Sequence, residues 1–167
     1  MSERTFNRGE DFNNRFAHLK SIMLIGEHTH TIDEKNRISL PAKFRKEMGK
    51  KIIITPGLDK CLFVFNFKQW QSVVKKLSSG SEGELSFLKA DQRNFNRIMF
   101  GQATDVEVDA IGRILLPEVL KVKIKVKSSA VFVGVEDRVE IWNERDWKSA
   151  KDRSEKEAEE LAEKLAK

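Results

Sequence analysis

A nine-residue unit occurs twice in this chain, and this repeat constrains the fold more than any other feature. Residues 33–41 read DEKNRISLP and residues 109–117 read DAIGRILLP. Asp, Arg, Ile, Leu and Pro are shared in register, and the second copy lies 76 residues after the first. Self-similarity at a long spacing indicates that one supersecondary unit has been used twice.

The similarity extends well beyond the nine residues. Each copy is followed by a segment of helical character, then by a strand-like run, and then by a stretch that ends in Asn-x-x-x-Trp. These segments are 42–48, 52–54 and 59–70 in the first half, and 118–122, 130–133 and 136–147 in the second. The two copies are therefore expected to be whole structural halves of one α+β protein.

Each position of the unit has a local physical reason. Asp at the edge of a turn accepts backbone N–H groups. Asn36 and Gly112 occupy equivalent positions, and Asn and Gly are the residues that best tolerate a positive φ, which predicts a left-handed turn residue there. Ile-x-Leu then resumes a strand, and Pro suits the first turn of a helix. The predicted order is strand, tight turn, strand, short helix, strand and strand, with Asn66 and Asn143 each capping a following helix.

The segments outside the two halves are more polar. Ser81 and Glu84 form a capping-box pattern that predicts a helical connector ending near Gly101, and Ser154 and Glu157 predict a second helix start near the C-terminus. We predict five segments. They are a polar tail (1–22), the first half (23–77), the connector (78–101), the second half (102–147) and a charged helical extension (148–167).

Positive charge is concentrated beside the two copies. The net charge is +5, and residues 35–51 hold seven basic side chains while residues 113–127 hold five. Clustered positive charge is what phosphate neutralisation requires. Each cluster taken alone is equally compatible with an ordinary solvated face.

Other classes of function find little support in the sequence. No apolar run approaches a membrane span, and the first twenty residues lack the apolar stretch of a signal peptide. The single cysteine, Cys61, cannot form an internal disulfide, which favours a reduced, cytoplasmic setting. Phosphate-loop and nucleophile-elbow motifs are absent, so we expect no enzyme activity, cofactor or small-molecule substrate. His28 and His30 share a strand face but lack further ligands nearby, so we expect no metal.

The repeated motifs resemble those of the MraZ family. The resemblance is carried by GEHTHTID (26–33) through PAKFR (41–45), by GLDKCLFV (57–64), by residues 109–117 and by RVEIW (138–142). It implies two AbrB-like, SpoVT-type swapped-hairpin halves in one chain that assembles into a ring. It also implies a nucleoid-associated regulator that binds short direct DNA repeats upstream of the division and cell wall gene cluster, including its own gene. Asn36 is a departure, because the family commonly has Gly there.

The family's Asp-x-x-x-Arg signature maps onto Asp33 with Arg37 and onto Asp109 with Arg113. We expect the two arginines to contact double-stranded DNA, through phosphate or guanine, although each could instead be structural and paired with its Asp. The Asp residues are expected to form the turns and orient the arginines. Further candidate contacts to DNA are Lys35, Lys43, Arg45, Lys46 and Lys121.

Two rival functions stay open at this point. One is an antitoxin-like protein that binds DNA through such a hairpin and a toxin through another segment. The other is a scaffold whose ring matters more than DNA. The doubled unit argues against the first, because antitoxins of this kind usually carry one copy.

Overall fold

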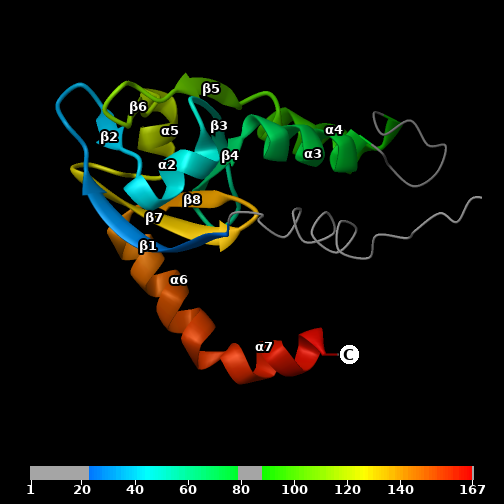
Figure 1. Ribbon diagram of the computed structural model, residues 1–167. Helices are drawn as coiled ribbons and strands as arrows, with labels where there is room; N and C mark the ends of the chain where they lie inside the picture. The colour runs from blue at the N-terminus through cyan, green and yellow to red at the C-terminus, as the bar shows by residue number, and fades with distance from the viewer. Residues whose placement is uncertain (1–22, 79–87, 167) are drawn as a thin grey trace, which may run out of the picture.

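The computed structural model describes residues 23–78 and 88–166. Within these residues, six strands form one antiparallel sheet in the order β1-β7-β8-β4-β3-β5 (Figure 1). In that order the strands are Leu24–Thr31, Ser129–Glu136, Val139–Trp142, Leu62–Asn66, Lys51–Pro56 and Thr104–Glu107. Two short strands, β2 (Arg37–Ser39) and β6 (Arg113–Leu115), pair antiparallel in a separate ribbon. The predicted α+β class and tandem repeat are confirmed.

The two halves exchange strands rather than folding side by side. Strand β1 of the first half pairs with β7 of the second, and β5 of the second half pairs with β3 of the first. Equivalent strands therefore stand at the same distance on either side of the sheet centre: β8 and β4 are central, β7 and β3 come next, and β1 and β5 are the edges. Because every main pairing except β3–β4 and β7–β8 joins the halves, neither half can bury its core alone.

Two short helices cover one face of the sheet. They are α2 (Ala42–Met48) and α5 (Glu118–Lys123), which follow Pro41 and Pro117. Equivalent side chains of the two halves meet in one apolar cluster and are at most 2% exposed, namely Ile38 with Ile114, Leu40 with Leu116, Phe44 with Leu120, and Met48 with Ile124. The shared residues of the repeat thus form a common core between sheet, ribbon and short helices.

The longer helices lie outside this core. Helix α3 (Phe67–Ser78) follows β4, and its first turn is closed by Asn66, whose side chain accepts the Gln69 backbone N–H at 2.8 Å. Helix α4 (Ala90–Met99) ends close to α3, where Phe100 meets Trp70 of α3 edge-on at 5.6 Å between ring centroids (Figure 1). Thr55 of β3 holds this end by donating to the Met99 carbonyl at 2.6 Å. The Ser81 and Glu84 pattern lies outside the described residues.

The C-terminal segment departs from the predicted helix start. Helix α6 (Glu144–Lys156) is capped by Asn143, whose side chain accepts the Asp146 backbone N–H at 2.8 Å. It runs through Ser154, which is therefore a residue of the helix interior and no cap. Helix α7 (Ala158–Leu165) begins only after a break at Glu157. The prediction from Ser154 failed because the preceding turns of α6 already supply the backbone hydrogen bonds that a cap would replace.

No helix in the described part of the chain is long and apolar enough to cross a bilayer.

Candidate nucleic-acid interface

The first turn of the repeat is closed by Asp33. Its carboxylate accepts the backbone N–H groups of Lys35 and Arg37, both at 2.9 Å, and the Nε of Arg37 at 2.7 Å. Asn36 has a φ of 58°, the left-handed conformation that such a turn needs. The backbone bonds donated by Arg37, more than its guanidinium, hold the pKa of Asp33 below its ordinary value.

The second turn reproduces this geometry. Asp109 accepts the backbone N–H groups of Ile111 at 3.1 Å and Arg113 at 2.8 Å, and the Nε of Arg113 at 2.8 Å. Gly112 has a φ of 83°. In both turns the carboxylate takes only the Nε of the arginine. The outer nitrogens of both guanidinium groups have no hydrogen-bond partner among the described residues, and the side chains are 36% and 30% exposed.

The two arginines lie on one face of the β2–β6 ribbon. Arg37 is directly opposite Leu115, and Ser39 is directly opposite Arg113. Residues directly opposite each other in an antiparallel pair point to the same side, so these four side chains share the outer face. Ile38 and Ile114, between them, point inward and are at most 1% exposed. The ribbon is anchored by its apolar face and presents its arginines outward.

The halves support each other's turns. The Leu40 N–H donates to the Gly112 carbonyl and the Leu116 N–H donates to the Asn36 carbonyl, both at 2.9 Å. Asn36 also accepts Lys121 Nζ at 2.6 Å through its side-chain oxygen and donates to Glu118. Lys121, whose side chain is 18% exposed, therefore secures the first turn from the second half.

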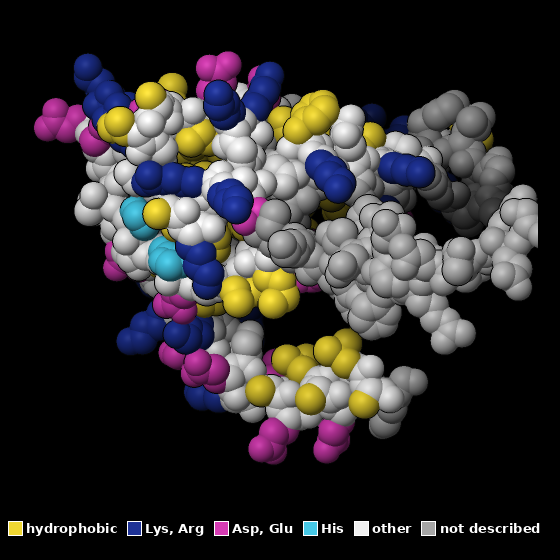
Figure 2. All heavy atoms as spheres, viewed as in Figure 1, with side chains coloured by type: hydrophobic (Ala, Val, Ile, Leu, Met, Phe, Trp, Pro, Cys, Tyr) yellow, Lys and Arg dark blue, Asp and Glu magenta, His cyan; other side chains and the backbone are white. Residues whose placement is uncertain are grey.

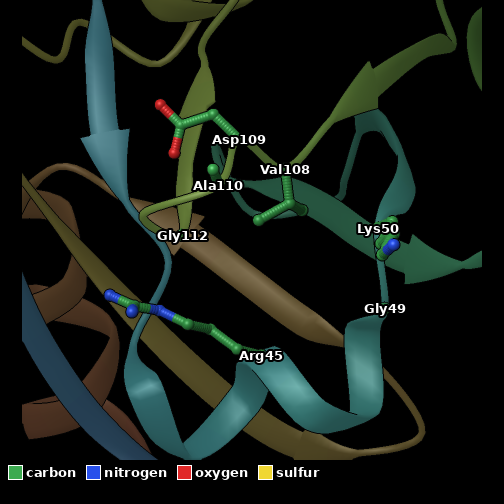
Figure 3. Close-up of a pocket in the computed structure, with 7 residues that line it drawn as sticks. All are labelled: Arg45, Gly49, Lys50, Val108, Asp109, Ala110 and Gly112. Carbon is green, nitrogen blue, oxygen red and sulfur yellow. The ribbon is translucent and has the colours of Figure 1, made fainter.

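Arg45 is the equivalent of Lys121, but its hydrogen bond stays within its own half. Its Nε donates to the Leu40 carbonyl at 2.7 Å, and its guanidinium reaches under the turn at Gly112 (Figure 3). A Cβ on Gly112 would lie 2.3 Å from Arg45 Cζ, so any other residue there would push the Arg45 side chain aside, besides having to adopt a positive φ. Arg45 and Lys121, both predicted to contact DNA, thus have internal partners: Leu40 of its own half for Arg45, and Asn36 of the opposite half for Lys121.

The remaining predicted lysines are open to solvent. Lys35 lies at the tip of the first turn, and Lys43 and Lys46 lie on α2. None of the three has a side-chain hydrogen bond or ion pair within the described residues, and Lys and Arg side chains are prominent on this side of the molecule (Figure 2).

The second half differs at these surface positions. Where the first half has Lys35, Ser39, Lys43 and Lys46, the second has apolar side chains that are 58–77% exposed, namely Ile111, Leu115, Val119 and Val122. Of the basic side chains expected beside the second copy, Lys125 and Lys127 line a separate hollow with Asn143 and Arg145. Leu115 was missed by the sequence analysis, although the Arg-Ile-Leu alternation already places it on the same strand face as Arg113.

The histidines are packed against aromatic rings. His28 meets Phe44 edge-on at 5.2 Å and His30 meets Phe132 at 6.0 Å between ring centroids. Burial, helped by His28 and Arg45, lowers the pKa of His30. The two rings are visible beside Lys and Arg side chains in Figure 2. No group of three metal-ligating side chains occurs within residues 23–78 and 88–166.

Comparison with known proteins matches both halves to one family. The family model described as "MraZ protein, putative antitoxin-like" matches residues 23–98 and again residues 99–167. A protein of Thermoanaerobacter sp. (strain X514) named transcriptional regulator MraZ is 41% identical over 143 residues, covering 86% of this chain and 96% of the relative.

Two further relatives carry the same name. The protein of Desulforamulus reducens is 44% identical over 143 residues, which cover 86% of this chain and 97% of the relative. That of Moorella thermoacetica is 44% identical over the same length, covering 86% and 96%. With both halves matched and most of the chain aligned to transcriptional regulators of this name, the chain belongs to the MraZ family.

Proposed function

We propose that this chain is a transcriptional regulator that binds specific double-stranded DNA sequences through the β2–β6 ribbon. The observation that carries the proposal is the pair Arg37 and Arg113, which project from one face of the ribbon while Asp33 and Asp109 hold their Nε atoms. As the family resemblance implies, its targets are short direct repeats in the promoter of the division and cell wall gene cluster, which includes its own gene. A protein with this role acts in the cytoplasm, at the nucleoid.

The shape of the ribbon suits this role. The major groove of B-DNA is about 12 Å wide and admits a two-stranded antiparallel ribbon. The outer nitrogens of Arg37 and Arg113 are the atoms that bind guanine O6 and N7 bidentately, or grip a phosphate. Holding each guanidinium by its Nε fixes its direction before DNA arrives, which reduces the entropy lost on binding.

The lysines divide into two roles. Lys35 in the first turn and Lys43 and Lys46 on α2 are exposed and serve as phosphate contacts, which position the protein without reading sequence. Lys121 already binds Asn36 of the opposite half, and Arg45 binds the Leu40 carbonyl of its own half and lies against Gly112, so we assign both to positioning the turns. This division predicts that only the first group contributes to the salt dependence of DNA binding.

One ribbon offers few contacts, so several copies of the chain must act together. An oligomer, as in the ring that the family resemblance implies, would place many ribbons along repeated sites and raise their effective concentration. Phe95 and Ile98 on one side of α4, with Leu88 before it, remain 37%, 47% and 66% exposed. This apolar face supports contact between subunits, because burying it would remove exposed apolar area from water.

The proposal is tested with a duplex that covers the region upstream of the protein's own gene. We expect the full-length protein to protect repeated sites in a footprint. Replacing Arg37 and Arg113 together by Ala should abolish the protection, since each bidentate pair contributes about 1–3 kcal/mol of discrimination. Light scattering should show the same oligomer for the variant and the parent.

The matched control removes two positive charges far from the ribbon. Arg153→Ala with Lys164→Ala changes exposed residues of α6 and α7. This variant should keep the footprint. Sequence-specific protection by the Arg37→Ala, Arg113→Ala protein would contradict the assignment of the ribbon as the DNA-reading surface.

A further inference from the structure

We propose that Leu115 contacts thymine methyl groups and that its difference from Ser39 fixes which way round the ribbon lies on DNA. This inference rests on the proposed DNA-binding function and names the chemistry that the ribbon reads. It concerns two side chains that stand in equivalent places of the repeat and share the outer face with the arginines.

The position of Leu115 follows from the strand register. It lies directly opposite Arg37, and Ser39 lies directly opposite Arg113. The bond from the Leu116 N–H to the Asn36 carbonyl marks a hydrogen-bonded pair, so the alternate pair Arg37–Leu115 is a non-hydrogen-bonded one. Side chains of such pairs lie closest together, with Cα atoms roughly 4.5 Å apart. Whatever the arginine contacts, Leu115 is therefore brought close to the same partner.

The exposure of Leu115 is informative because of its neighbours. A single exposed leucine is ordinary, yet this one is 58% exposed on a three-residue strand between two outward-facing arginines. A partner that covers this face must offer acceptors to guanidinium groups and an apolar group within a few ångströms of them. The DNA major groove offers both, as guanine O6 and N7 and as the C5 methyl of thymine.

The two ends of the outer face differ chemically. The backbones are related by the repeat, and so are Arg37 and Arg113, so a ribbon with identical outer residues would bind a site equally well in either orientation. Ser39 presents a hydroxyl where Leu115 presents an apolar group. At the tips the same contrast recurs, with Lys35 in the first turn and Ile111, 63% exposed, in the second. The second half therefore favours thymine on its side of the site, and the ribbon binds the site in one orientation only.

The test begins with duplexes selected from a random pool by the full-length protein. Each thymine of the selected site is then replaced by deoxyuridine, which lacks only the methyl group. We expect one or two replacements to weaken binding about fourfold, the value of burying one methyl-sized group at about 0.8 kcal/mol. Leu115→Ala should remove this sensitivity. Leu115→Ser should select a site that is more nearly symmetric than the parent's.

The control and the contrary outcomes separate this inference from the proposed function. Leu165→Ala, at an 88% exposed leucine of α7, should keep the sensitivity to deoxyuridine. If the parent protein selects no sequence, the proposed function itself fails. If the parent selects a site and Leu115→Ala shows the same deoxyuridine profile, only the role of Leu115 is overturned. Loss of the oligomer in Leu115→Ser, by light scattering, would instead make Leu115 a contact between protein chains.

Discussion

The two halves of this protein share their interior and their turns but differ on their outer surfaces. Asp33 and Asp109 make the same three hydrogen bonds, and Ile38 and Ile114 are equally buried. Around these shared residues the first half presents three lysines and a serine where the second presents isoleucine, valine and leucine. The difference teaches that the repeat encodes a scaffold, and that its two copies are free to acquire separate surface roles.

The reason lies in how the halves depend on each other. A change in the core or the turn of one half reaches the other half through the exchanged strands and the reciprocal turn contacts, so both copies are held to one geometry. A change at an outward position such as Ser39 or Leu115 disturbs no core contact. Three experiments sharpen or break this comparison.

The largest effect is expected at the left-handed turn positions, which are equivalent in backbone but differ in surroundings. Gly112→Ala should lower the free energy of unfolding by about 2–4 kcal/mol. The left-handed conformation costs about 1–2 kcal/mol, and the new Cβ displaces Arg45 from its charged hydrogen bond. Urea unfolding at fixed protein concentration measures this.

Asn36→Gly is the matched change in the first half. It should lower the free energy of unfolding by no more than about 1.5 kcal/mol. Glycine adopts the left-handed conformation without strain, but the hydrogen bonds of Asn36 to Lys121 and Glu118 are lost. Equal losses for Gly112→Ala and Asn36→Gly would show that Arg45 does not constrain the second turn.

A smaller effect separates lysines that support a turn from lysines that meet phosphate. Lys121→Met should lower the free energy of unfolding by about 1–2 kcal/mol and leave the salt dependence of DNA binding unchanged. Lys43→Met should leave the free energy of unfolding unchanged. It should reduce the magnitude of the slope of log K for DNA binding against log salt concentration by about 0.9. Binding isotherms at several salt concentrations give the slope. A reduced slope for Lys121→Met would assign that lysine to DNA after all.

The smallest effect concerns acid. The pKa values of Asp33 and Asp109 both lie below the ordinary value of 3.8, first because of backbone hydrogen bonds from Arg37 and Arg113. A carboxyl whose pKa is lowered by folding stabilises the fold above its unfolded pKa, and this contribution is lost as pH falls through the folded pKa. Both turns should therefore weaken only below about pH 3.8.

Carboxyl titration by NMR checks this equivalence of the turns. Arg37→Ala should raise the pKa of Asp33 only slightly, because the alanine backbone still donates, and should leave Asp109 unchanged. A marked difference between the pKa values of Asp33 and Asp109 in the parent protein would contradict the equivalence of the two turns.

Much of the local structure was predictable from the residues themselves. The order of elements, the positive φ of Asn36 and Gly112, and the caps at Asn66 and Asn143 all follow from interactions within a few residues. The tandem repeat was also predictable, because the two copies of the motif align residue by residue in the sequence. The failed helix start at Ser154 shows the limit, since a local cap pattern says nothing about a helix already under way.

The sequence by itself determined the turn that aims each arginine, because Asp, Asn or Gly, and Arg act over five residues. Only the tertiary structure decided that β1 pairs with β7, that Lys121 supports the turn of the opposite half, and that Leu115 faces the same side as Arg37. These contacts join residues some 75 or more positions apart. Local propensity cannot choose among such pairings, because they depend on which faces are buried together in one shared core.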